Sequence, residues 1–375
     1  MHAVFYGGIC LKQLIALMLC LMLTALSACA LAAMNYELDN PNLSYQKLSD
    51  ALPVAQQAEP APAPDTWPKT FTITVAGDTT LGSTPDLRKR DDCFENVAQE
   101  KGYAWFFSGL YDLFSTDDMT LVNFEGTLTE SNDTKEKKFN FKGPAEYTDI
   151  LTLGSVEAVT IANNHIVDYG EQGKQDTILN LENAGIVVSG GGILGIFERN
   201  GVKVGLTGYC FPYKDGKKDI TKDVKALREA GCQIVVASFH WGSEYREDFT
   251  GEQRTIGRAA IKAGADVVVG HHPHIVQGVE SYKDTYILYS VGNLVFGGNV
   301  DPDDRDALAA RLTFTVHEDR AEAPELTLVP LRLTELSDGT DYRPVLAEGS
   351  EAERILKRVL RRSSNMDGFE NGSWQ

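Results

Sequence analysis

The chain of 375 residues has little cysteine and an excess of negative charge. Three of its six cysteines lie within the first 29 residues, which leaves Cys93, Cys210 and Cys232 in the rest. Three cysteines form at most one intramolecular disulfide, so a disulfide-held scaffold is excluded. Lysine and arginine number 35 against 53 acidic residues, a formal net charge of −18. Because such a chain does not neutralise phosphate backbones, we expect no nucleic-acid partner.

Charge is also scarce at the N-terminus, where Lys12 is the only charged side chain before Glu37. Residues 15–23 form an apolar run typical of a secretory signal. The segment Leu26-Ser27-Ala28-Cys29 resembles the bacterial lipobox, whose cysteine becomes the lipid-modified first residue of the mature protein. We expect residues 1–29 to be a signal and lipoprotein segment, with lipid attachment at Cys29. The protein would then be exported, extracytoplasmic and anchored in the cell membrane. Ordinary cleavage after residues 30–32, or a retained apolar anchor, are the alternatives.

The rest of the chain divides by composition into three parts. Residues 30–68 are rich in Pro and Ala and indicate an extended tether. Residues 69–345 are expected to form one folded domain. The last part, 346–375, is expected to hold a basic helix over 352–362 and a disordered tail from residue 365.

Within the folded part, β-rich runs alternate with helical patterns, which predicts an α/β fold with helices on both faces of buried strands. A period-2 pattern at 311–316 predicts antiparallel strands near the end. The expected strands include 71–76, 120–124, 158–162, 234–239, 267–269 and 286–291, and the expected helices include 104–114, 146–153, 173–184, 224–230 and 252–263.

Polar segments follow five of the apolar strands directly. Because ligands in α/β proteins collect at the carboxyl ends of strands, we expect these segments to form one site. The five segments are Gly77-Asp78, Asn123-Phe124-Glu125, Asn164-His165, His240-Trp241-Gly242 and Gly270-His271-His272-Pro273-His274.

Three imidazoles within four positions, His271, His272 and His274, are hard to explain by packing alone. A metal ion resolves this, since neutral histidine is the commonest metal ligand. A surface histidine cluster is the alternative. Mixed carboxylate, amide and imidazole ligands suit Mn, Fe or Zn, so we expect one or two divalent ions. The expected metal ligands are Asp78, Glu125, Asn164, His240, His271, His272 and His274.

Individual residues in these segments and close to them have different expected roles. Glu125 is the candidate for bridging two cations, and His165 is the candidate catalytic residue, placed to protonate a leaving oxygen. Asp168 is expected to brace a loop or to cap a helix. Trp241 and Asn293 are expected to support the site from behind the ligands, with Trp241 facing the substrate as an alternative. Asp78 could instead cap a turn.

The same motifs, taken in order, resemble one known family. Val75-Ala76-Gly77-Asp78, Val122-Asn123-Phe124-Glu125-Gly126 and Asn163-Asn164-His165 are followed by Phe239-His240-Trp241-Gly242 and the 270–274 cluster. This pattern resembles the bacterial CapA capsule-synthesis (poly-γ-glutamate) family, itself similar to the calcineurin-like metallophosphoesterases. The resemblance implies a four-layer αββα sandwich and assigns Asn164 and His240 as ligands and His165 as general acid.

Two positions depart from the phosphoesterase pattern. Asp78 is followed by Thr79-Thr80-Leu81, so the histidine of the first block is missing, and Glu125 stands where the second block has Asp. The resemblance implies a membrane-tethered, metal-dependent phosphoesterase of capsule or cell-envelope polymer metabolism, acting on an anionic polymer or phosphoester. The alternative is a non-catalytic accessory protein that binds polyglutamate or a membrane synthase complex. A metal-dependent peptidase acting on γ-glutamyl or peptidoglycan bonds is a third possibility.

Overall fold

The structure is a computed structural model and describes residues 66–211, 216–366, 369–370 and 373–374. The predicted signal segment with Cys29, and the predicted tether as far as residue 65, lie outside the described residues. In the described part of the chain, no helix is long and apolar enough to cross a membrane.

The first of two large sheets is built around β1, Lys69–Thr80. Its parallel neighbours run outward as β2 (Met119–Phe124), β5 (Ala158–Thr160) and β6 (Val187–Ser189), and β13 (Asn293–Phe296) pairs with its C-terminal end. The other half is antiparallel, as the period-2 pattern predicts. Its strands are β14 (Asp306–Val316), β15 (Glu325–Arg332) and β16 (Val345–Leu346).

The second sheet has a parallel centre and antiparallel edges. Its order is β11 (Val279–Tyr282), β12 (Thr285–Leu288), β10 (Val267–His271), β9 (Ile234–His240), β8 (Val202–Cys210) and β7 (Gly195–Arg199). The strands β12, β10, β9 and β8 are parallel, so their carboxyl ends lie along one edge. Every residue of β9 and β10 is buried, which explains why these strands are continuous apolar runs.

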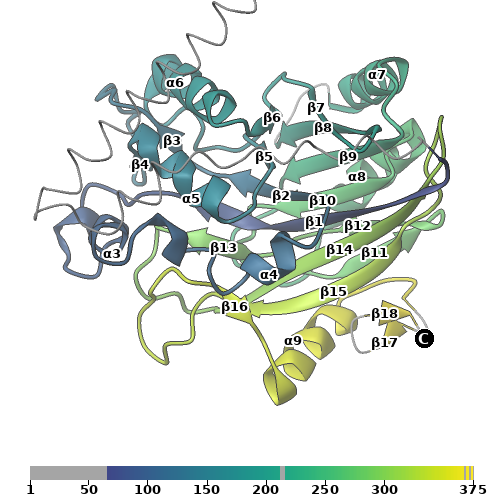
Figure 1. The fold of residues 1–375 in the computed structure, drawn as a ribbon. Helices are drawn as coiled ribbons and strands as arrows, with labels where there is room; N and C mark the ends of the chain where they lie inside the picture. Colours follow the sequence, from purple (N-terminus) through teal and green to yellow (C-terminus); the bar gives the residue numbers. More distant parts are fainter. Residues whose placement is uncertain (1–65, 212–215, 367–368, 371–372, 375) are drawn as a thin grey trace, which may run out of the picture. The chain divides into compact units, whose positions relative to one another are not determined.

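Three apolar cores hold four layers together (Figure 1). The central core joins β1, β2 and β14 of the first sheet to β8, β9 and β10 of the second. The outer face of the first sheet is covered by α3 (Phe94–Lys101), α4 (Tyr111–Phe114), α5 (Thr148–Leu153) and α6 (Gly170–Asn183). The outer face of the second is covered by α7 (Gly216–Glu229) and α8 (Gly251–Ala263). The predicted α/β sandwich with four αββα layers is confirmed.

The predicted helix at 104–114 is wrong, because the segment is broken. A 3-10 turn at Tyr103–Trp105 precedes the separate short helix α4. Between them lies Gly109, where a Cβ would come within 2.4 Å of the Pro344 carbonyl oxygen. The chain segment before β16 therefore packs directly on the backbone here, a long-range contact that local sequence does not reveal.

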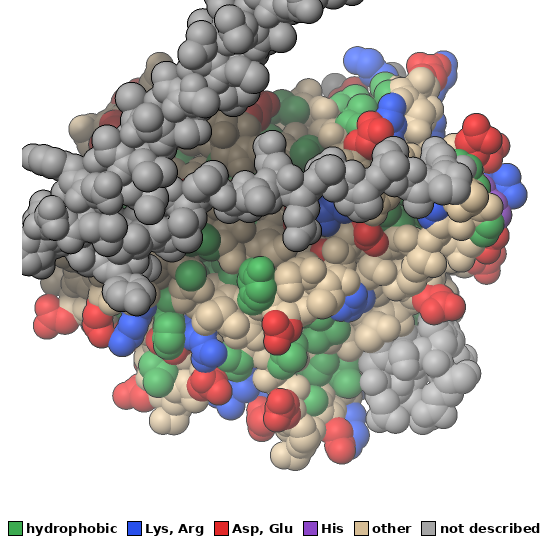
Figure 2. Space-filling model, viewed as in Figure 1, with side chains coloured by type: hydrophobic (Ala, Val, Ile, Leu, Met, Phe, Trp, Pro, Cys, Tyr) green, Lys and Arg blue, Asp and Glu red, His purple; other side chains and the backbone are tan. Residues whose placement is uncertain are grey.

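The C-terminal part also differs in detail from the prediction. The basic helix is present as α9 (Gly349–Arg361), and two of its arginines are paired: Arg354 binds Asp306, and Arg358 binds Asp304, each at 2.8 Å. Figure 2 shows acidic and basic side chains interspersed on this face of the molecule. Of the predicted tail from residue 365, the structure describes 365–366, 369–370 and 373–374, and the last two pairs form the short antiparallel strands β17 (Phe369–Glu370) and β18 (Ser373–Trp374).

The tight packing of β10 leads to a stability prediction. A Cβ on Gly270 would lie 2.0 Å from the Tyr289 carbonyl oxygen and 2.5 Å from Trp241 Nε1. We expect Gly270→Ala to lower the free energy of unfolding by about 3 kcal/mol or more, because backbone must move to make room. The matched control is Gly251→Ala at the start of α8, where a Cβ meets nothing within 4 Å. The control should be neutral or slightly stabilising. Urea denaturation measures both, and equal midpoints would contradict the packing argument.

Candidate metal centre

The five polar segments meet where the carboxyl ends of the two sheets come together. Asp78 lies near the end of β1 and is paired in register with Asn123 of β2, while His271 ends β10 beside His240 of β9. Ion-pair distances connect the sheets: His271 Nδ1 lies 3.1 Å and His274 Nδ1 lies 3.2 Å from the Asp78 carboxylate. The structure thus brings the predicted residues of both sheets into one buried cluster.

Asp78 is the most heavily contacted carboxylate of this cluster. It is fully buried, accepts a 2.9 Å hydrogen bond from Asn123 Nδ2, and accepts one of 3.2 Å from the backbone N–H of His272. Burial alone would raise the pKa of Asp78, but hydrogen bonds and positive charge from His271 and His274 hold it well below its usual range. Asp78 is therefore an ionised anchor for the histidine loop rather than the cap of a turn.

Glu125 is in the opposite situation. It has no exposed surface, and neither carboxylate oxygen accepts a hydrogen bond from the described protein. Three imidazole nitrogens surround one of its oxygens: His165 Nε2 and His240 Nε2 at 3.8 Å and His274 Nε2 at 4.0 Å. Burial raises the pKa of Glu125 to about 8. A buried carboxyl group without hydrogen bonds, surrounded by imidazole nitrogens, is an environment that a divalent cation would fit.

The side chains beside Glu125 are suited to holding a cation. Asp78, Glu125 and His240 offer ligand atoms that all lie within 4.8 Å of one another. Burial lowers the pKa of His240 well below its ordinary value, so its imidazole is neutral, the form that binds metal. Its Nε2 lies 2.7 Å from Asn164 Oδ1, which places the predicted amide ligand at the same point.

A second group of ligand atoms lies next to the first. Glu244, His272 and His274 also offer atoms within 4.8 Å of one another, and the rings of His240 and His272 are 4.6 Å apart. Sequence analysis did not single out Glu244 as a ligand. The available signal was its place four residues after His240, but the exposed loop between them gives no periodicity from which to infer its direction.

The histidine loop itself has an unusual backbone. His272 and His274 have φ angles of 94° and 57°, in the left-handed region that residues with a Cβ rarely occupy. His274 Nδ1 lies 2.9 Å from Asn293 Oδ1, so the predicted supporting role of Asn293 corresponds to a direct contact. Strained backbone of this kind persists only where surrounding contacts enforce it, and it concentrates at functional sites.

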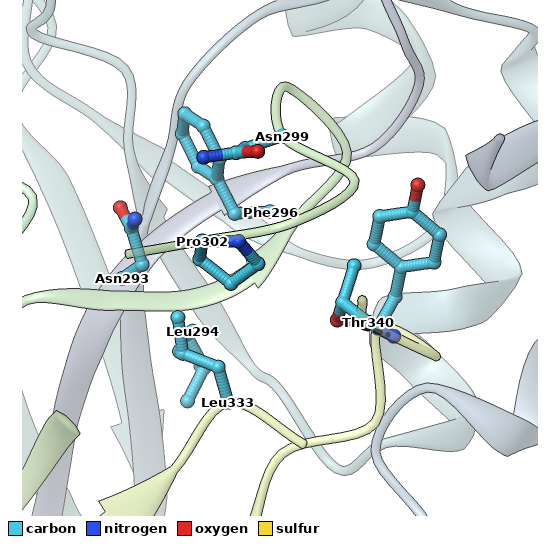
Figure 3. A pocket seen from close by; sticks show the side chains of 8 residues that line it. Asn293, Leu294, Phe296, Asn299, Pro302, Leu333 and Thr340 are labelled. Carbon is cyan, nitrogen blue, oxygen red and sulfur yellow. Dashed lines mark hydrogen bonds between the residues drawn. The ribbon is translucent and has the colours of Figure 1, made fainter. Parts of the chain in front are cut away.

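A small pocket lies beside Asn293. Figure 3 shows Leu294, Phe296 and Pro302 among its lining residues. Its volume is about 10 Å³, room for one water molecule at most. This pocket is therefore packing behind the His274 support and not a place for a substrate.

His165 is held by a pair of charged residues. Its Nδ1 lies 2.8 Å from Asp168 Oδ2, while its Nε2 faces Glu125. Asp168 is fully buried and also accepts hydrogen bonds from the Phe141 backbone N–H and binds Lys137 Nζ. The helix-cap interpretation of Asp168 is wrong, because α6 begins at Gly170 with Tyr169 at its N-cap. The bracing interpretation agrees with these contacts.

Lys137, in the basic run 135–138, is a residue of the site that sequence analysis did not predict. Its Nζ contacts the Asn164 carbonyl oxygen at 3.0 Å and His165 Nδ1 at 3.1 Å. The residue is thus folded back onto the site by contacts with three polar groups. No local pattern in the run distinguishes it from its neighbours Lys135 and Lys138.

Three further residues surround the ligands without contributing to either group of ligand atoms. Trp241 turns away from the cluster, packs in the core beneath α8, and donates from Nε1 to the Tyr289 carbonyl oxygen at 2.8 Å. It therefore does not face a substrate. Asn163 donates to Asn123 Oδ1 at 3.0 Å and to the Phe124 carbonyl oxygen at 2.7 Å, which joins the ends of β2 and β5. His271 is buried on β10 and neither of its ring nitrogens makes a well-aligned hydrogen bond.

Comparison with known proteins adds an independent finding. Residues 72–298 match the family model described as bacterial capsule synthesis protein PGA_cap, a range that contains all five polar segments. The chain is 32% identical over 225 residues to the PGA biosynthesis protein CapA of Bacillus subtilis, a match covering 54% of this chain and 59% of that protein. It is 26% identical over 254 residues to the capsule biosynthesis protein CapA of Bacillus anthracis, covering 60% of each.

A third similar protein is a probable polyglutamine synthesis accessory protein of Mycobacterium tuberculosis. The identity is 26% over 282 residues, covering 67% of this chain and 69% of that protein. The chain spans about three fifths of the length of the two Bacillus proteins.

The lack of hydrogen bonds at Glu125 predicts that its replacement affects stability differently with and without metal. Glu125→Gln replaces a buried carboxyl group that the protein leaves without a hydrogen bond and whose ionisation burial already opposes. The metal-free variant should therefore be as stable as the unchanged protein or more stable, by up to about 1 kcal/mol above the pKa of Glu125. The rise in Tm on adding Mn²⁺ or Zn²⁺ should disappear, because ligand binding to the folded state is what raises it. Thermal melts with a chelator and with added metal measure both. Exposed Glu182→Gln should retain the rise, and an equal rise in Glu125→Gln would refute the assignment.

Proposed function

Because the chain belongs to the bacterial capsule synthesis protein PGA_cap family, we propose that it is a CapA-like protein of capsule or poly-γ-glutamate metabolism. In this proposal it is exported, tethered to the membrane at Cys29, and works as a metal-dependent hydrolase of phosphoester type. The similar protein described as a synthesis accessory protein is consistent with work beside a membrane synthase complex.

The observation that carries the metal-dependent part is the unpaired carboxylate of Glu125 among three imidazoles. Asp78, Glu125, Asn164 and His240 would hold one cation, and Glu244, His272 and His274 a second. Mixed oxygen and nitrogen donors favour Mn, Fe or Zn. A bound cation would supply Lewis-acid polarisation of a phosphoryl oxygen.

The chain's own residues supply proton transfer and orientation. Asp168 accepts the Nδ1 proton of His165, which fixes the ring and leaves Nε2 directed at the cluster. Burial lowers the pKa of His165, and the hydrogen bond to Asp168 opposes that shift. With Nδ1–H bound to Asp168, Nε2 is the nitrogen that would take up a proton and deliver it to a leaving oxygen, and the positive charge this requires is the one that Asp168 stabilises. Lys137 ties Asp168 to the Asn164 backbone and so keeps both predicted residues in position.

A non-catalytic accessory role is the second candidate, and one observation favours it. Thr80 stands two residues after Asp78, where a phosphoesterase has a further histidine ligand, and its hydroxyl is buried without a hydrogen bond. A protein with a weakened cation site could keep the fold for binding polyglutamate or a synthase. A metal-dependent peptidase acting on γ-glutamyl or peptidoglycan bonds is the third candidate, and a screen with such substrates tests it.

The hydrolase proposal predicts a separation between turnover and metal content. His165→Gln should lower turnover of a phosphoester by about 10²–10⁴, since it removes a positioned proton donor, while metal content stays unchanged. Elemental analysis of the purified protein and a phosphodiester assay measure the two quantities. His317→Gln, at a partly exposed histidine paired with Glu322 outside the site, is the matched control and should change neither. Full activity in metal-free protein rules out the hydrolase, and metal-replete protein inert towards a broad phosphoester panel supports the accessory role.

The anchoring proposal predicts a chemical change at Cys29. Mass spectrometry of protein from membranes should find Cys29 as a lipid-modified N-terminal residue. Cys29→Ser should abolish that modification, whereas Cys20→Ser, within the signal segment, should leave it intact. An unmodified N-terminus at residue 33, or an intact segment from residue 1, would contradict the lipoprotein assignment in favour of ordinary cleavage or a retained anchor.

A further inference from the structure

A second cavity opens beside the metal centre, between helices of the two outer layers. It has a volume of about 520 Å³. One wall is the end of β5 with residues 161–163, another is the end of β8 with residues 207–210, and the glycine turn 191–192 closes a side. Lys174 of α6 and Lys222 of α7 line it from helices that cover different sheets (Figure 1).

This cavity shares structure with the metal centre. Asn163 lines it and donates to the Asn123 side chain, whose own amide group binds Asp78. Cys210 also lines it and is the register partner of His240. A chain-like ligand lying in the cavity would therefore run directly towards the metal centre.

The two lysine side chains that line the cavity are available to bind a ligand. Lys222 makes no ion pair or hydrogen bond with any residue that the structure describes, and the one ion pair of Lys174 is a loose 3.8 Å contact with exposed Glu171. The side chain of Lys174 is only 21% exposed, so its charge is partly withdrawn from solvent. In a chain of net charge −18, two such lysines facing one cavity create a local site for an anion.

The cavity also carries hydrogen-bond acceptors. Asp219 and Asp223 lie on the α7 face that bears Lys222, and Asp223 accepts a 2.9 Å hydrogen bond from the Tyr209 hydroxyl. These carboxylates would repel a densely charged polyphosphate. They would accept hydrogen bonds from amide N–H groups that alternate with carboxylates along a peptide.

From this combination we propose that the cavity is a binding subsite for an acidic peptide-like chain. Lys174 and Lys222 bind its carboxylates, the α7 carboxylates bind its amide N–H groups, and the chain leads on towards the cluster of Asp78 and Glu125. This inference deepens the proposed function, because it states where an acidic polymer lies relative to the metal centre. It does not depend on catalysis, since binding alone is claimed.

The test is a titration of the full-length chain with a fluorescein-labelled decamer of γ-linked glutamate, followed by fluorescence anisotropy. The double variant Lys174→Gln, Lys222→Gln should weaken binding by about tenfold or more, through loss of two charge-assisted contacts. The double variant Lys225→Gln, Lys262→Gln removes the same charge from exposed positions of α7 and α8 outside the cavity and should bind as the unchanged protein does. Unlabelled polyphosphate of equal charge should displace the peptide poorly.

The outcomes separate this inference from the metal proposal. Equal weakening in both double variants would show unspecific attraction and overturn the subsite, as would absence of binding or efficient displacement by polyphosphate. Glu125→Gln should still bind the peptide although its metal-induced rise in Tm is lost. If Glu125→Gln keeps that rise while the Lys174 and Lys222 variant loses the peptide, the metal proposal fails and the subsite stands.

Discussion

The sealed carboxylate of Glu125 is the constraint around which the molecule is organised. Ionising a carboxyl group away from water is costly unless it is paired, and here the nearest imidazole nitrogens lie at 3.8–4.0 Å, which is why burial raises the pKa of Glu125 to about 8. Such a residue is tolerated because the three apolar cores around it are large and continuous. Those cores are formed by strands that are buried on both faces, and they fix the relative positions of the five strand ends. The packing of the cores therefore opposes the repulsion between charged groups at those ends. The fold thus stabilises an arrangement that its polar groups alone would not adopt.

Two sets of contacts fix the positions of the individual side chains of the site. Close backbone approach at Gly270 fixes the start of the histidine loop against Tyr289, and the left-handed residues His272 and His274 continue it under the support of Asn293. On the facing side, Asp168 orients His165 through the Nδ1 hydrogen bond, and Phe141 packs on its ring at a centroid distance of 4.5 Å. Lys137 in turn binds Asp168 and the Asn164 carbonyl oxygen. Both sides of the site are therefore held by hydrogen bonds and packing together.

Much of this was predictable from the sequence, for physical reasons. Apolar strands followed at once by Asp, Asn, Glu or His place those groups at strand ends, and parallel strands bring such ends together, so Asp78, Glu125 and His240 were identified without coordinates. Glu244 and Lys137 were not, because each reaches the cluster through a loop whose path depends on distant contacts. The prediction of a continuous helix over 104–114 failed for the same reason, because the residue that packs on Gly109, Pro344, lies more than two hundred residues away in the sequence. The walls of the second cavity come from helices on opposite sheets, and no local pattern joins them.

The contact between His240 Nε2 and Asn164 Oδ1, at 2.7 Å, joins two groups that would serve the same cation. Two donors that each lie about 2.0–2.2 Å from a shared ion stand at a similar separation, so this spacing already suits a common ion. Asn123 Nδ2 lies 3.5 Å from His240 Nδ1, on the opposite side of the same ring. Binding of a cation by this pair would therefore be coupled to the position of a single ring proton, because only a nitrogen without a proton can act as a ligand.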